Sequence, residues 1–287
     1  MTLAEALRTY LQAQFQKIEM EEAGIIAAAD PEHLHRFRVA LRRSRSLLGE
    51  MRSNLVPELE DLRRQMAEVA CQTNVCRDAD VLLAQWGHWQ ARLPDFLAPG
   101  LGALEKPLRQ RRDHAHRQVV ALLRSPEYHA FKENWRRWLS QPPDAWMQPG
   151  WDDDLEALLE RRIQRRRRRL GKRLTRLNAQ IPPDCLHQIR IAVKKLRYLM
   201  EFALITTEKK RFRKMIERIR PLQDRLGRHH DAAVQGIWLR QIFLESSRLT
   251  RRSAAALGWL LHDLDRRQRR IAAKFCKKRQ KWLLLLT

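Results

Sequence analysis

The sequence LHQIRIAVKKLRYLM, residues 186–200, places two neighbouring stripes of side chains on one predicted helix. Its apolar residues recur at steps of three and four, which is the period of a single helix face. A second set follows the same steps one position later, about 100° round the helix from the first. The apolar stripe is Leu186, Ile189, Val193, Leu196 and Met200, and the second stripe is His187, Arg190, Lys194 and Arg197. The stretch therefore predicts a buried helix face with a cationic face directly beside it.

No acidic residue balances this second stripe between Cys185 and Met200. A face so close to a core is usually apolar or mixed in sign, because an isolated buried charge is costly. Exposed helices usually place an acid four residues from a base, because like charges at that spacing repel. The alternative is an ordinary surface face whose Arg and Lys stems cover apolar neighbours. We favour a groove that an anion from outside the chain fills, with Arg and Lys suited to phosphate.

The same two stripes recur in LHRFRVALRRSRSLL, residues 34–48. The cationic stripe here is His35, Arg38, Arg42 and Arg45, and the apolar stripe is Leu34, Phe37, Leu41 and Leu48. His35 and His187 are 152 residues apart. Further on, the segment RDADV at 77–81 matches HDAAV at 230–234, at an offset of 153. Two matches in register predict an internal duplication and two related helical halves.

These residues resemble the CHAD family, the conserved histidine α-helical domain, over roughly residues 2–285. Each half of that family has a His-x-x-Arg-x-x-x-(Lys/Arg)-(Lys/Arg)-x-Arg helix and a later Leu-Gly-x-x-Arg-Asp-x-x-Val segment. The resemblance implies an all-α fold of two tandem four-helix-bundle-like halves, related by a pseudo-twofold axis, whose basic helices share one cavity. It also implies that this cavity binds inorganic polyphosphate and that the protein associates with polyphosphate granules.

The direct ligands expected from the two stripes are His35, Arg38, Arg42, Arg45, His187, Arg190, Lys194 and Arg197, with Arg43 and Lys195 beside them and Arg36 as a flanking cation. His35 and His187 fall in the first turns of their predicted helices, where free N–H groups and the helix dipole favour a bound anion. A histidine so placed can also be purely structural. Two in register with cationic stripes favour donation to phosphate.

The second family motif is split between the halves. The first half keeps Arg77 and Asp78 but has Asn74 where the family has Gly, and the second keeps Gly227 and Asp231 but has His230 where the family has Arg. Asp78 and Asp231 are expected to open helices, so an N-cap role alone would explain them. The other interpretation, held equally, is that each carboxylate orients an arginine of the site.

The charge of the chain is large and unevenly distributed. It has 57 Lys and Arg against 33 Asp and Glu, a net charge of +24, which predicts binding to polyanions. Residues 1–150 hold 21 basic and 19 acidic side chains, net +2, and residues 151–287 hold 36 and 14, net +22. The second half also has cations where the first has Glu58, Asp61 and Gln65. The supporting cations expected there are Arg165, Arg169, Arg211, Lys214 and Arg218.

The compartment is expected to be the reducing cytoplasm. Cys71, Cys76, Cys185 and Cys276 form no Cys-x-x-Cys pair and no disulfide-like framework. Glu5 lies where a signal peptide would be apolar, and the longest apolar run, 282–286, is far too short to span a bilayer. No membrane partner is expected, and the sequence leaves the oligomeric state open.

The expected organisation is a first helical half at 1–143, a linker at 144–153 and a second, more basic half at 154–287; the stretch from Ser140 to Gly150 holds three prolines and a glycine. Capping signals at Thr2 and Asp30 mark helix starts, the acidic run Asp152-Asp153-Asp154 suits another, and Pro182-Pro183-Asp184 is expected to cap the second stripe helix. Separate helices are expected at about 208–226 and 231–248, and one helix at about 251–285. No stretch alternates like a strand, so the predicted class is all-α.

The sequence favours a binding protein over an enzyme, with no metal and no cofactor. His229-His230-Asp231 superficially resembles the His-Asp ligands of metal phosphohydrolases, but nothing identifies further ligands that converge on it. There is no Gly-rich phosphate loop and no acidic cluster for Mg²⁺. A nucleic-acid-binding protein that contacts only the backbone is the alternative. The tryptophans at helical spacing favour a core over the stacking platforms that single strands require.

Overall fold

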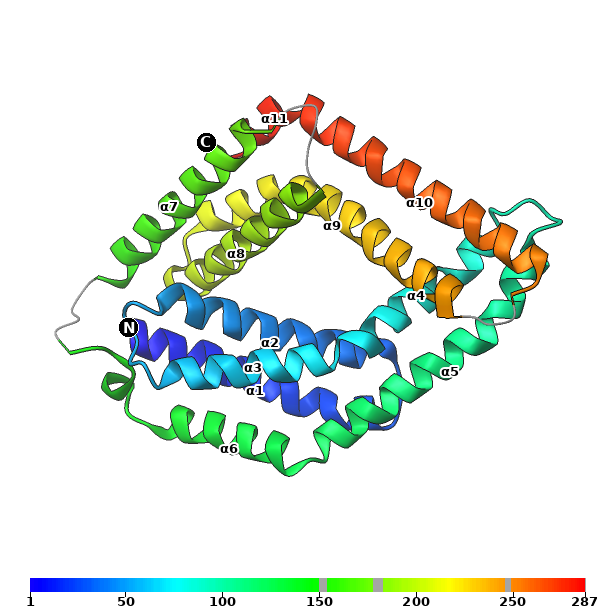
Figure 1. Ribbon diagram of the computed structural model, residues 1–287. Coiled ribbons are helices and arrows are strands. Elements are labelled where there is room, and N and C mark those ends of the chain that lie inside the picture. The colour runs from blue at the N-terminus through cyan, green and yellow to red at the C-terminus, as the bar shows by residue number, and fades with distance from the viewer. Residues whose placement is uncertain (150–153, 178–182, 246–248, 287) are drawn as a thin grey trace. The chain divides into compact units, whose positions relative to one another are not determined.

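The computed structural model of the protein describes residues 1–149, 154–177, 183–245 and 249–286, and side chains at 183–184 are not described. Over these ranges the regular structure is helical, apart from an isolated bridge between Leu55 and Met147. The predicted all-α class is therefore confirmed (Figure 1). The elements are α1 (Leu3–Ile26), α2 (Pro31–Met51), α3 (Leu59–Gln72), α4 (Asn74–Gln90), α5 (Ala98–Leu123), α6 (Pro126–Ser140), the 3₁₀-helix η1 (Pro143–Trp146), α7 (Leu155–Thr175), α8 (Pro183–Thr207), α9 (Lys210–Glu245), α10 (Arg251–Lys277) and α11 (Arg279–Leu284).

The helix starts marked by capping residues are confirmed. Thr2 and Glu5 form a reciprocal capping box at α1, and the Asp30 carboxylate accepts the Glu32 N–H at the start of α2. Asp154 accepts the backbone N–H groups of residues 156 and 157 at the start of α7. These caps satisfy N–H groups that have no partner inside the helix.

The chain forms two compact units, each assembled from separate segments. Unit 1 contains Met1–Asp80, Arg111–Arg161 and Glu201–Lys209, and unit 2 contains Val81–Gln110, Arg162–Met200 and Lys210–Thr287. The boundaries of these units fall inside α4, α5, α7 and α8. The units therefore follow a different division from the halves expected along the sequence, and the duplication stays a prediction.

In unit 1 the helices α1, α2 and α3 lie side by side (Figure 1). The apolar stripe of α2 faces this core, since Leu34, Phe37, Leu41 and Leu48 are all buried. Tyr10 of α1 meets Phe202 of α8 edge to face at 5.4 Å, within the same unit. Burial of these side chains supplies most of the free energy that holds the helices together.

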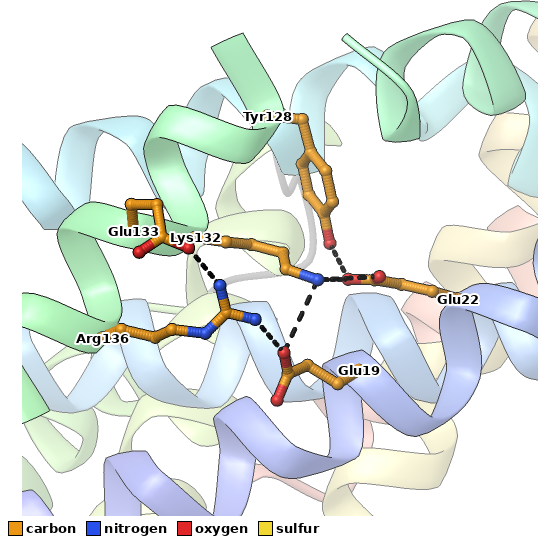
Figure 2. A network of polar contacts seen from close by, with 6 residues as sticks. All are labelled: Glu19, Glu22, Tyr128, Lys132, Glu133 and Arg136. Carbon is orange, nitrogen blue, oxygen red and sulfur yellow. Dashed lines mark hydrogen bonds and ion pairs between the residues drawn. The ribbon is translucent and has the colours of Figure 1, made fainter. Parts of the chain in front are cut away.

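A polar network joins α1 to α6 in unit 1 (Figure 2). The buried ammonium of Lys132 lies 2.9 Å from the Glu22 carboxylate, to which the Tyr128 hydroxyl also donates. Arg136 donates to Glu19 and forms an ion pair with Glu133. Burial and the Glu22 carboxylate raise the pKa of Tyr128, so its hydroxyl remains a donor at every physiological pH.

Part of the predicted linker packs against unit 1. Trp146 in η1 is fully buried, and its carbonyl accepts the N–H of Val56 at 3.0 Å. The Gln148 N–H donates to the carbonyl of Asn54 at 2.9 Å. Residues 150–153 of the linker lie outside the described residues, as does Pro182 in the predicted cap of α8.

Two helix boundaries expected in the second half are wrong. The helices expected at about 208–226 and 231–248 are one helix, α9, which continues past Pro221 and Gly227. Its buried side chains keep a helical period from Phe212 to Ile242, and their packing outweighs the local cost of Pro and Gly. Asp231 lies in the interior of α9 and Asp78 in the second turn of α4, so neither is an N-cap.

The helix expected at about 251–285 is divided at Lys278 into α10 and α11. The break stacks Trp282 on Phe275 at 5.5 Å and lets the Trp282 indole donate to the Phe275 carbonyl. Arg167 of α7 donates to the Leu286 carbonyl, and Arg279 donates to that of Leu177. The last helix is thereby fixed against α7 within unit 2. No helix in the described part of the chain has both the length and the apolar character needed to cross a bilayer.

Candidate anion-binding site

The cationic stripe of α8 lies beside the core of unit 2. Leu186, Ile189, Val193 and Leu196 are buried on one face of the helix. The stripe residues His187, Arg190, Lys194 and Arg197 are half-buried, and Lys195 is exposed. The charged groups therefore lie at the boundary between the core and solvent, where the spacing of the sequence places them.

Helix α9 faces this stripe in antiparallel orientation (Figure 1). Near the start of α8 the His187 ring lies 5.3 Å from the His230 ring, with 33° between the ring planes. Nearly three turns later, Arg197 donates to the Gln223 side chain at 2.8 Å. Because residue numbers rise along α8 as they fall along α9, the two contacts fix the direction of the pair.

An open groove of about 550 Å³ lies between these two contacts, entirely within unit 2. From α8 it is lined by Arg190 and Lys194. The residues of α9 that line it are Gln223, Asp224, Gly227, Arg228 and Asp231. Three permanent cations thus face two carboxylates, and none of the lining side chains is apolar or aromatic.

The electrostatic field of the groove shifts the pKa values of its titratable neighbours. Burial, followed by the charges of Arg190 and His187, lowers the pKa of His230 to about 4. Burial also lowers the pKa of His229. Desolvation raises the pKa of Asp231 although its side chain keeps contact with solvent, and Arg190 and Lys194 offset this shift only in part. Burial therefore disfavours charge of either sign on these groups, while the cations of α8 oppose a positive charge on His230 and favour a negative charge on Asp231, as expected of a site for anions.

The cationic stripe of α2 in unit 1 is engaged differently. The guanidinium of Arg38 donates to the Ala70 carbonyl at 2.6 Å, to the Thr73 hydroxyl and to the Asn74 side chain at 2.6 Å. These acceptors lie where α3 ends and α4 begins. Burial lowers the pKa of Arg38 to about 10, an effect that Asp78 opposes. Arg38 is therefore a charged side chain at neutral pH that holds the junction between two helices.

The other cations of α2 are close to one another. Burial and the charge of Arg77 lower the pKa of His35, and Arg42 adds to the shift. Burial and the charge of Arg63 lower the pKa of Arg45. Arg77 itself reaches the Pro31 carbonyl at 3.4 Å and lies 3.5 Å from Glu32. The structure therefore brings the predicted stripe of unit 1 together with Arg77.

The flanking cations of α2 are bound by acids of unit 1. Arg43 forms an ion pair with Glu201 at 3.1 Å, and Arg36 forms one with Glu21 at 2.6 Å. The supporting cations Arg165, Arg169, Arg211, Lys214 and Arg218 are all exposed. Arg211 lies over the Phe212 ring at 5.1 Å, and Arg218 contributes to the lowered pKa of Arg167. Arg218 of α9 is therefore close enough to Arg167 of α7 to act on its charge.

Sequence reasoning missed several groove residues. Arg228, Gln223 and Asp224 line the groove, and the His230 ring lies in tilted contact with that of the predicted ligand His187. A signal for them existed, because positions 224, 227, 228 and 231 share one helix face once α9 is read as continuous. The shared cavity and the orienting roles of Asp78 and Asp231 stay predictions. The described residues contain no group of three or more His, Cys, Asp or Glu side chains placed to hold a metal.

Comparison with known proteins gives a consistent result. A family model described as CHAD domain matches residues 9–240. The chain is similar to the crystal structure of the CHAD domain from the plant Ricinus communis, with a TM-score of 0.81 and 26% sequence identity over 98% of this chain and 91% of that chain. It shares its fold with PptA from Streptomyces chartreusis, with a TM-score of 0.73 and 20% identity over 97% and 98% of the two chains. No curated protein matches it.

Proposed function

The chain belongs to the CHAD domain family, and on that basis we propose that it binds inorganic polyphosphate without cleaving it. The groove of unit 2 is the observation on which this proposal rests. Arg190, Lys194 and Arg228 line it, and burial together with the charges of Arg190, His187 and Lys194 lowers the pKa of the adjacent His230. A chain of phosphates supplies the negative charge that such a groove lacks.

The form of the groove favours polyphosphate over nucleic acid. Single-stranded nucleic acids bind best where aromatic side chains alternate with cations, so that the bases stack. The groove has no aromatic lining residue, and Trp86, Trp89 and Trp135 are buried in cores. A polyphosphate chain has neither bases nor sugars to accommodate, so its phosphates can follow the row of cations on α8 directly.

The proposed ligand set combines the two predicted stripes with the groove. In unit 2, His187, Arg190, Lys194 and Arg197 bind the phosphates together with Arg228. In unit 1, His35, Arg42 and Arg45 contribute more weakly, since Arg38 is held by the protein's own acceptors. We place this activity in the cytoplasm and in association with polyphosphate granules.

A competition titration tests the proposal. Polyphosphate, RNA and DNA of matched total charge are titrated against the protein at physiological salt, and free phosphate is measured in the same samples with Mg²⁺ or Mn²⁺ present. Polyphosphate is expected to bind at least tenfold more tightly than either nucleic acid, with no phosphate released. Comparable affinities would leave counterion release as the sole cause of binding. Metal-dependent release of phosphate that Asp231→Ala abolishes would establish an enzyme instead.

A further inference from the structure

His230 of unit 2 differs in chemical type from Arg77, the residue at the corresponding position of unit 1. Arg77 lies beside the stripe histidine His35, and His230 lies beside the stripe histidine His187. The neighbour of the histidine is thus a permanent cation in unit 1 and a titratable imidazole in unit 2. The two positions correspond at the offset of 153 residues seen in the sequence.

We propose that His230 is a proton-gated ligand of the groove, neutral when the groove is empty and protonated when polyphosphate is bound. Binding would then take up a proton from solvent, and affinity would rise as the pH falls. The proposal rests on the proposed function of the same groove, and it adds a binding residue and a means of regulation.

The geometry places His230 where a bound anion would act on it. Its ring lies in tilted contact with that of His187, which is one turn before Arg190 on α8. The next residue, Asp231, lines the groove. A phosphate chain that runs along Arg190 towards His187 would pass the His230 ring and could accept a hydrogen bond from it.

The charged groups around His230 are mainly cationic. His187, Arg190 and Lys194 act on it from α8, and His229 acts from its own helix. Asp231 and Arg228 are its charged neighbours on the groove side of α9. On α10, which packs along α9, Asp263 and Asp265 form ion pairs with Arg267 and Arg269. An anion in the groove would therefore be the first strong compensation for a positive charge on His230.

The direction of the pH effect follows from linkage. The pKa of His230 is about 4 in the empty groove, and a bound anion raises it towards or beyond the ordinary value of about 6.5. Between these two values only the complex holds the extra proton, so lowering the pH strengthens binding. Above the raised value and below about 4, both states have the same protonation and the effect vanishes. For one proton the maximum change is about tenfold per pH unit.

The test measures polyphosphate affinity from about pH 8 to about pH 5.5 for the wild type, His230→Gln and His230→Arg. The wild type is expected to bind at least tenfold more tightly at the lower pH. His230→Gln is expected to stay near the wild-type affinity of high pH throughout, and His230→Arg near that of low pH. Dextran sulfate serves as the reference polyanion, because its charge does not change over this range.

Two controls separate His230 from its neighbours. Asp231→Asn removes the groove carboxylate whose pKa is already raised, and His35→Gln removes the stripe histidine of unit 1. Both are expected to keep at least half of the wild-type change in log affinity. Calorimetry in two buffers of different ionisation enthalpy counts the protons taken up, and circular dichroism confirms that each variant is folded. If His230→Arg does not fold, His230→Gln and the proton count decide the question.

The outcomes of the test are distinct. A pH profile for His230→Gln that matches the wild type, or no proton uptake by the wild type, would overturn the role of His230 and leave polyphosphate binding intact. Absence of polyphosphate binding at every pH would instead overturn the proposed function. A loss of the pH effect in Asp231→Asn, with His230→Gln unchanged, would assign the proton to the carboxylate.

Discussion

The stripes of α2 and α8 have nearly the same residues at the same spacing, but the helices that face them differ. In unit 1, Arg38 donates hydrogen bonds to Ala70, Thr73 and Asn74, where one helix ends and the next begins. In unit 2 the corresponding Arg190 lines an open groove beside a continuous helix. A break in the facing helix supplies carbonyl and side-chain acceptors, whereas an unbroken helix uses its carbonyls internally. The comparison therefore predicts that a break in the facing helix ties a cationic stripe more firmly to the protein itself.

The largest expected effect concerns ligand affinity. Replacing both Arg190 and Lys194 with Ala should weaken polyphosphate binding roughly a hundredfold, because two charge-assisted contacts of the groove are lost. The corresponding double variant Arg38→Ala with Arg42→Ala should cost roughly tenfold or less. Isothermal titration calorimetry at one salt concentration measures both. Equal losses would show that the stripes contribute equally, and a larger loss from the α2 pair would place the dominant site in unit 1.

The next prediction concerns stability, and here the substitution in α2 is expected to have the larger effect. Arg38→Ala should lower the free energy of unfolding by about 1–2 kcal/mol, since hydrogen bonds from a charged donor across the α3–α4 junction are lost. Relief of repulsion from Arg42 and Arg77 keeps this loss modest. Arg190→Ala is the matched variant in α8 and should change stability by less. Urea denaturation measures the free energy of unfolding of both variants. The prediction is wrong if Arg190→Ala is as destabilising as Arg38→Ala.

The two stripes also show what the sequence can and cannot predict. Periodicity correctly placed Leu34 and Leu186 in cores and their cationic neighbours at the edge, because helix geometry fixes which residues share a face. The caps at Thr2 and Asp30 were also predictable, because each involves residues only two or three positions apart. The acceptors of Arg38 lie more than thirty residues away in sequence and include a backbone carbonyl, which no side-chain pattern reveals. Asp231 was misplaced because the predicted helix ended just before Gly227, whereas tertiary packing keeps α9 continuous through that residue.

The smallest expected effect comes from exchanging the residue that faces each stripe for a residue like its counterpart. Asn74 accepts a hydrogen bond from Arg38, and the corresponding residue in α9 is Gly227, which lines the groove. Asn74→Ala removes this acceptor, and alanine avoids the extra backbone freedom that glycine would add. One N–H of Arg38 then becomes available to phosphate, so polyphosphate should bind roughly two- to threefold more tightly.

Gly227→Asn is the reciprocal variant. Apart from the local backbone of α9 and the neighbouring residues, no atom lies within 4 Å of a Cβ built at Gly227, so the asparagine fits and its side chain enters the groove beside the cations of α8. This variant should weaken binding by a similar factor. The two effects are measured by competition against the wild type at constant salt, with thermal melts to confirm folding. If both variants shift affinity in the same direction, the acceptor at this position does not decide the difference between the stripes, and the cause must lie in the net charge around each helix.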